Sequence, residues 1–139
     1  MAFFSEDIAT YLRTALSSTA IYVGAIPEAQ VVTELAAAVR DVPGGTSEYV
    51  MGSTVAARVA YSVGIVQVTV RAPKDGMEAC EALMSSIHAL LRFASGVTVG
   101  SHTYDKIMAE VEPYMVAAPD TGERPMWACT YECWLRGAG

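Results

Sequence analysis

The sequence has little charge and no basic cluster. Charged residues make up 17% of its 139 residues and apolar residues 53%, whereas a charged share of roughly 25% is usual. The nine lysine and arginine residues are scattered, and the formal net charge is −6. A nucleic-acid binder needs clustered basic side chains to neutralise phosphates, so we expect no direct sequence-specific contact with nucleic acid. So little charge has two interpretations. Part of the surface contacts copies of the chain or a partner, or the core is well filled and only a few alanines are exposed.

Cysteine and histidine are also scarce. The three cysteines form an odd set, which argues against a disulfide framework. Cys129 and Cys133 share one face of a predicted strand, about 13 Å apart by strand rise and too far for a bridge. His88 falls in a predicted helix and His102 in a turn, so zinc-ligand spacing is missing. We expect buried free thiols, and no metal or cofactor.

Long hydrophobic runs are missing as well. No apolar run reaches the roughly 18 residues that a membrane-spanning helix needs. Acidic residues stand near the N-terminus, where a signal peptide carries basic ones. We therefore expect no membrane partner and synthesis in the cytosol. The length predicts one domain, residues 1–139.

Hydrophobic periodicity predicts two helices. Ser5 is a candidate N-cap, followed by acidic residues in the first turn and apolar residues at helical spacing as far as Leu16. A longer helix is expected over 75–94, with histidine and serine on its outer side. The apolar stripe of this longer helix consists of Met77, Cys80, Leu83, Met84, Ile87, Leu90 and Leu91.

The remaining patterns predict strands. They cover residues 21–23, 34–42, 63–72, 97–100, 103–111 and 126–136. The segment 34–42 is ambiguous, because its alanines suit a helix whereas its flanking residues suit a strand. Residues 43–60 form either a long irregular insertion that contacts a partner or a wide hairpin whose second strand starts near Val55.

The strand 63–72 has two unlike faces. Gly64, Val66, Val68, Val70 and Ala72 point one way and should pack on a helix. Gln67, Thr69 and Arg71 point the other way, toward water or another subunit. We predict an α+β fold: a mixed or antiparallel sheet of about five to six strands, with the N-terminal helix and one long helix packed on one face.

Motifs that carry chemistry are missing. There is no Gly-x-Ser-x-Gly sequence, and no cysteine has the basic or helix-N-terminal surroundings that activate a thiol. Glu110 and Glu112 resemble a solvated strand face more than a catalytic pair. Gly44-Gly45-Thr46 lacks the lysine of a phosphate-binding loop. The sequence does not predict an enzyme.

The order of several short motifs resembles a known family. After the N-terminal helix come Ile-Tyr-Val-Gly-x-Ile-Pro-Glu at 21–28 and Pro-Gly-Gly at 43–45. Val-Gln-Val-x-Val-Arg at 66–71 then precedes the long helix, and Gly-x-x-x-Tyr-Asp-x-Ile at 100–107 and Pro-Asp-x-Gly-Glu-Arg at 119–124 follow it. Over nearly its whole length the chain resembles the minor capsid and tail terminator (head–tail joining) proteins of tailed bacteriophages.

This resemblance implies a virion structural protein in the phage tail or neck, assembled in the host cytoplasm. Subunits of that family close into a hexameric ring that ends polymerisation of the tail tube protein and joins the tail to a neck or head-completion protein. DNA may pass through the ring. The resemblance suggests these residues for contacts between subunits or with the tube: Tyr49, Met51, Arg58, Arg71, Asp120, Glu123 and Arg124. Of these, Arg71 and Arg124 would be ion-pair donors.

Two other readings stay open at the level of sequence. One is a tail tube or another head-completion protein, which would form a similar ring with a different stacking rule. The other is a small ligand-binding α+β domain that dimerises through its sheet. Gln67, Thr69 and Arg71 are the candidates for its pocket.

Overall fold

The computed structural model describes residues 4–17, 20–25, 35–50, 59–73, 75–116 and 124–136, without the side chains of 44–50 and 59–61. The elements follow in the order α1 (Phe4–Leu16), β1 (Ile21–Val23), β2 (Ala36–Val50), β3 (Val59–Arg71), α2 (Met77–Leu91), β4 (Phe93–Val99), β5 (His102–Ala109), β6 (Tyr114–Met115) and β7 (Met126–Arg136). This is the α+β fold that the sequence predicts.

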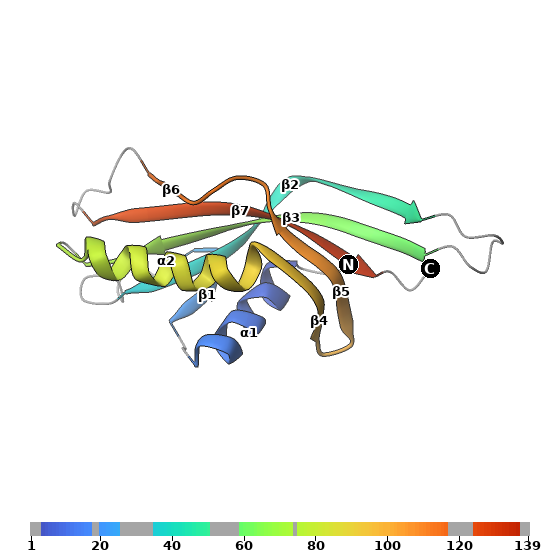
Figure 1. Cartoon of the computed structure of the whole chain (residues 1–139), viewed down its shortest axis with the longest axis horizontal. Helices are drawn as coiled ribbons and strands as arrows, with labels where there is room; N and C mark the ends of the chain where they lie inside the picture. The colour runs from blue at the N-terminus through green and yellow to red at the C-terminus, as the bar shows by residue number, and fades with distance from the viewer. Residues whose placement is uncertain are drawn as a thin grey trace.

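The strands form one sheet in the order β1-β2-β3-β7-β5-β4, and β6 pairs with β7 beyond the end of β5. Among the described strands, β1 and β2 pair in parallel, and the other pairs are antiparallel. Both helices lie on the same side of the sheet, and the β4–β5 hairpin bends toward α1 (Figure 1). The mixed sheet and the position of both helices confirm the prediction.

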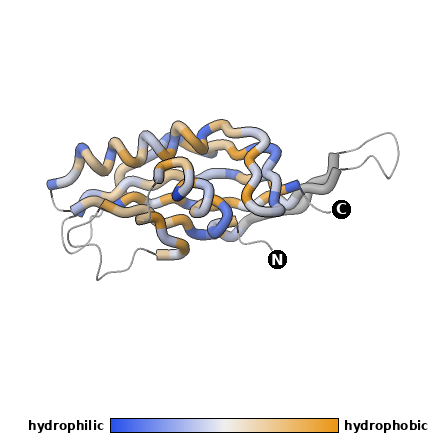
Figure 2. The backbone as a smooth tube through the Cα atoms, turned by 90° about the horizontal axis from the view of Figure 1, so that it is seen from below, coloured by the Kyte–Doolittle hydropathy of each residue, from blue (hydrophilic) through white to orange (hydrophobic). Residues whose placement is uncertain are grey.

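The core lies between the helices and one face of the sheet. In β3, Val66, Val68 and Val70 are fully buried, and in the neighbouring β7 the same face presents Cys129, Tyr131 and Cys133. Buried α2 residues at helical spacing cover them, and hydrophobic and hydrophilic residues alternate along that helix (Figure 2). The alternation of residues 63–72 predicts that this same side of β3 packs against a helix.

Several boundaries differ from the predicted ones. Ser5 is not an N-cap but lies inside α1, where Asp41 of β2 accepts hydrogen bonds from its backbone N–H (3.1 Å) and its hydroxyl (2.7 Å). The long helix ends at Leu91 rather than Ala94, because β4 begins at Phe93. Met77, assigned to the apolar stripe of this helix, is 38% exposed.

The described parts of the segment 43–60, residues 43–50 and 59–60, are strand rather than irregular insertion. Strand β2 continues through Pro43 to Val50, with a shift of register against β3 between Val42 and Thr46. A proline is tolerated at an irregular position on the edge of a sheet. Proline has no backbone N–H, and at such a position no hydrogen bond between neighbouring strands is lost. The expected strand at 34–42 is confirmed from Ala36 onward. The expected start of a second strand near Val55 lies outside the described residues.

Candidate functional site

The face of the sheet opposite the helices is the first candidate site. It carries the side chains that alternate with the core set, including Gln67, Thr69, Thr130, Glu132 and Trp134. No helix of the described chain covers it (Figure 1). Apolar side chains also reach this face: Phe93 is 75% exposed, and its partner in the adjacent strand is Met108. The face is therefore a mixed surface, neither a second core nor fully polar.

Polar side chains on this face hold one another across strands. Arg40 Nε of β2 donates to Gln67 Oε1 of β3 at 2.7 Å, and Gln67 Nε2 donates to the Tyr114 hydroxyl at 3.3 Å. At the other end of the sheet, Lys106 Nζ lies 4.2 Å from the ring centroid of Trp134. These contacts fix the directions of two cations across the sheet.

The predicted contact residues are only partly described. Tyr49 lies in β2, opposite Ala60 of β3. Arg71 and Arg124 are buried, with exposed fractions of 9% and 8%, although the wet strand face and the turn predicted exposed positions. Met51, Arg58, Asp120 and Glu123 lie outside the described residues. Arg71 and Arg124 lie at the same end of the sheet, where the Ala72 N–H donates to the Pro125 carbonyl at 3.1 Å. The contact roles of the predicted residues remain predictions.

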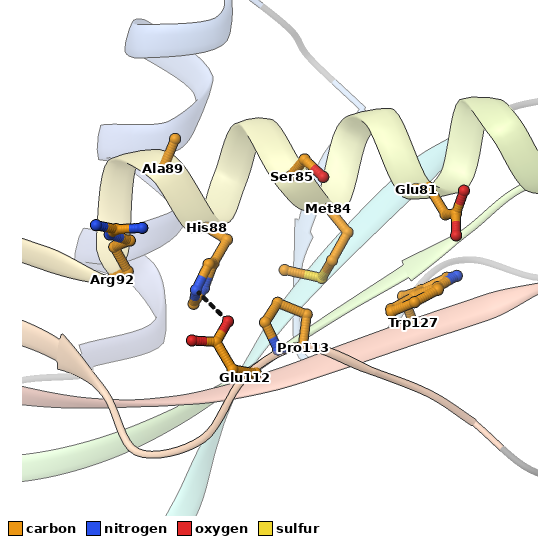
Figure 3. Close-up of a pocket in the computed structure, with 9 residues that line it drawn as sticks. All are labelled: Glu81, Met84, Ser85, His88, Ala89, Arg92, Glu112, Pro113 and Trp127. Atoms are coloured by element: carbon orange, nitrogen blue, oxygen red, sulfur yellow. Dashed lines mark ion pairs between the residues drawn. The ribbon is translucent and has the colours of Figure 1, made fainter.

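A cavity beside α2 is the second candidate site. Its volume is about 490 Å³, and α2 and the segment before β6 form its walls, with a side chain of β7 at one end. Figure 3 shows its lining residues: Glu81, Met84, Ser85, His88, Ala89, Arg92, Glu112, Pro113 and Trp127. Carboxylates, an imidazole and a guanidinium thus surround a floor of methionine, proline and tryptophan.

His88 is the central polar group of this cavity. Its Nδ1 lies 3.0 Å from the Tyr131 hydroxyl of β7, and its Nε2 lies 3.3 Å from Glu112 Oε2. The neutral imidazole with its proton on Nε2 satisfies both contacts: it accepts from Tyr131 and donates to Glu112. His88 therefore links α2 to the sheet and to the segment that leads into β6.

The nearby thiol of Cys129 is not activated by this histidine. Its Sγ lies 3.9 Å from His88 Nδ1 but donates to the Val111 carbonyl at 3.2 Å. Burial raises the pKa of Cys129, which keeps the thiol protonated near neutral pH. All three cysteines are free and buried. Among the residues described, no group of three metal-ligating side chains is arranged to hold a metal ion.

The sequence does not predict the His88 cluster. Its pattern puts His88 on the outer side of the helix and Glu110 and Glu112 on one strand face, but β5 ends at Ala109 and Glu112 turns toward α2. The contact between His88 and Tyr131 joins residues 43 positions apart. No local pattern reports such a pair.

A further acidic group anchors the start of α1. Asp7 Oδ2 lies 2.7 Å from His102 Nδ1 and accepts from the Tyr104 hydroxyl at 2.5 Å. Burial and then the Asp7 hydrogen bond raise the pKa of Tyr104. This contact joins α1 to the β4–β5 hairpin.

No helix in the described part of the chain is long and apolar enough to cross a membrane. No protein-family profile matches the sequence, and no curated protein matches it. The fold is similar to that of solved structures. One is a chain from the virion of a native gene transfer agent particle, with a TM-score of 0.64 and 14% identity over 97% of this chain and 96% of that one. A second solved structure, also 14% identical, has a TM-score of 0.54 and covers 98% of this chain and 92% of its own.

Proposed function

We propose that this chain is a structural subunit of a phage-like virion, and within it a tail terminator. Six copies would form a ring at the head-proximal end of the tail, end the growth of the tube and join the tail to the neck. The observation that carries this proposal is the shared fold with a protein of a gene transfer agent virion, which spans nearly the full length of both chains. The order of motifs that resembles the tail terminators supports the finer assignment.

The surface of the fold is compatible with this role. A ring of identical subunits needs a heterologous contact, in which two different patches of the same chain meet. A subunit with both helices on one side of its sheet offers two unlike faces (Figure 1). Ending a polymer requires one surface that binds the end of the tube and another that does not bind further tube subunits. Neither task needs catalysis.

Within this proposal, the β2–β3 hairpin and the 119–124 turn make the contacts with the tube and the neighbouring subunit. Strands β2 and β3 pair as far as Val50 and Val59, whereas β7, the other neighbour of β3, reaches only Tyr61. Among the described strands, none pairs with β3 at Val59 and Ala60 on that side. A two-stranded hairpin has little stability alone, so an assembly partner would support this one.

The test is the mass of the purified chain in solution across a concentration series, with negative-stain images of the same samples. Rings of about six subunits, or monomers that become rings on added phage-type tail tubes, are expected for a terminator. Long tubes formed by the chain alone would identify a tube protein instead. A stable dimer that ignores tail tubes would contradict both virion roles.

One observation favours a second candidate function, a dimeric ligand-binding domain. The cavity beside α2 has the volume of a small-molecule site and several converging polar groups. Calorimetric titration with a small-molecule panel would detect such a ligand. Variants at His88 and Arg92 should then lose the heat of binding while keeping the solution mass.

A further inference from the structure

The cavity beside α2 carries opposite charges at its two ends. Glu81 lines it from the second turn of α2, and Arg92 lines it as the C-cap residue of the same helix. Their Cα atoms are about 16 Å apart along the helix axis, from a rise of 1.5 Å per residue. Both residues are exposed, and neither side chain forms an ion pair or hydrogen bond within the described part of the chain. One end thus offers a carboxylate and the other a guanidinium.

The end that holds Glu81 is suited to a cation. Figure 3 shows the ring of Trp127 nearly edge-on below Glu81, with one ring face turned toward α2. The face of an aromatic ring carries negative charge density, so an ammonium or guanidinium group between this face and the Glu81 carboxylate is attracted by both. Met84 and Pro113 lie between the two ends (Figure 3). They offer apolar contact to the aliphatic stem of such a cation.

The end that holds Arg92 is suited to a carboxylate. A guanidinium binds a carboxylate through two parallel hydrogen bonds. His88 adds no charge in the neutral form that accepts from Tyr131 and donates to Glu112. Glu81 and Glu112 then outnumber Arg92 among the described lining residues. A ligand that is only an anion would therefore be repelled, and a ligand that is only a cation would leave Arg92 without a partner.

We propose that this cavity binds a ligand with a cationic head on an aliphatic stem and a carboxylate at its other end. A basic amino acid has this chemistry, and so does a protein chain that ends in one. The head lies between Glu81 and Trp127, and the carboxylate meets Arg92. This inference rests on the ligand-binding role proposed above for the same cavity, and it holds whether or not the chain forms rings.

Fluorescence titration tests this ligand class. A Trp134→Phe background leaves Trp127 as the one tryptophan of the chain, so its emission reports on the cavity. The probes are N-acetyl-arginine, its amide, which lacks the carboxylate, and N-acetyl-citrulline, which lacks the cation. At low salt, N-acetyl-arginine should bind saturably and about fivefold more tightly than either of the others. Equal affinity for the three probes, or no saturable change with any of them, would overturn the inference.

Three variants assign the binding to the two ends. Glu81→Gln should weaken binding of N-acetyl-arginine about fivefold, whereas Glu78→Gln, one turn earlier on α2 and outside the lining, should stay within about twofold. Arg92→Gln should weaken N-acetyl-arginine but not its amide, because only the acid offers a carboxylate to Arg92. Equal losses for Glu78→Gln and Glu81→Gln would contradict binding in the cavity. Circular dichroism confirms that each variant is folded, and the probe series on the unaltered cavity does not depend on the variants.

A ten-residue peptide that ends in arginine distinguishes the two sources of this chemistry. Binding at least as tight as that of N-acetyl-arginine identifies the terminus of a partner chain, and exclusion of the peptide identifies a free small molecule. Both outcomes support the ligand class.

Failure of this inference is distinguishable from failure of the proposed functions. A chain that forms rings and binds none of the probes would overturn the inference and leave the virion role standing. A chain that binds other members of the calorimetric panel, but none of these probes, would overturn the ligand class and leave the ligand-binding role standing.

Discussion

Gly64 of β3 lies directly against the ring of Phe4 at the start of α1. A Cβ atom placed on Gly64 would stand 2.6 Å from two carbons of that ring. Phe4 also contacts Tyr104 edge-to-face, with ring centroids 6.0 Å apart. Glycine at position 64 therefore allows α1 to approach the sheet closely.

Substituting Gly64→Ala should destabilise the fold, because the added methyl group displaces the Phe4 ring from its contact with Tyr104. We expect a loss of about 1–3 kcal/mol in the free energy of unfolding, typical of overpacking. Urea unfolding followed by circular dichroism measures it. In a Phe4→Ala background the same Gly64→Ala change should cost much less. An equal cost in both backgrounds would show that Phe4 is not the cause.

Much of this fold is predictable from local pattern. Alternation defines β7 from Met126 to Arg136 and its buried face, because a half-buried strand has a period of two. The end of α2 is not predictable in this way. Phe93 and Ala94 continue an apolar spacing that suits a helix, and pairing with β5 draws them into β4. Pro43-Gly44-Gly45 is typical of a strand end, yet β2 passes through it. This part of β2 lies at an edge of the sheet, and only the pairing of the strands shows that.

The candidate site was less predictable than the fold. The uncovered sheet face follows from the polar residues Gln67 and Thr69 in an otherwise apolar strand. The contacts on that face do not, because Arg40 meets Gln67 and Lys106 meets Trp134 only once the strand order is known. The His88 cluster depends on tertiary contacts with Tyr131 and Glu112, which no spacing encodes.

The carboxylate of Asp41 supplies the acceptor at the start of α1, so Asp41→Ala should weaken that helix end. Its loss leaves the Ser5 N–H and hydroxyl without this acceptor, and we expect a cost of about 1–2 kcal/mol, comparable to loss of a helix cap. The urea midpoint reports this change. Ser5→Ala is the matched control, because it removes the hydroxyl bond and keeps the backbone one. A larger loss for Ser5→Ala than for Asp41→Ala would contradict this account.

The Tyr131 hydroxyl links β7 to α2 through His88, so Tyr131→Phe should leave His88 Nδ1 without this donor. We expect a loss of about 1–2 kcal/mol in the free energy of unfolding, because the histidine side chain is only 12% exposed. Tyr114→Phe removes a longer bond on an exposed side chain and should stay within about 0.5 kcal/mol of the wild type. Equal losses in the two variants would show that the His88 contact adds nothing.

Buried thiols should remain unreactive until the chain unfolds. Burial raises the pKa of Cys80, Cys129 and Cys133 from the usual value of 9.0, and the thiolate is the reactive form. Titration with a chromogenic disulfide reagent at pH 8 should therefore show negligible labelling of the native protein within minutes. In denaturant the reagent should label all three cysteines of the chain. Rapid labelling of one cysteine in the native state would identify an exposed or activated thiol.

The same shifts predict a loss of stability at alkaline pH. Below pH 9 the thiols are protonated in both the folded and the unfolded chain, so stability does not depend on them. Above the unfolded value of 9.0, the unfolded chain releases protons that the folded chain retains, and the free energy of unfolding falls as pH rises. Tyr104 and Tyr131, whose pKa values burial raises above the usual 10.0, extend this fall above pH 10.

Urea unfolding at intervals from pH 7 to 11 measures this slope. Cys133→Ala removes the thiol whose side chain is fully buried between β3 and β5. The variant should be less stable at neutral pH, because it leaves a small cavity. Its stability should nevertheless fall less steeply between pH 9 and 10 than that of the wild type, because one proton fewer is released on unfolding. An identical slope would show that Cys133 ionises in the folded chain as readily as in the unfolded one.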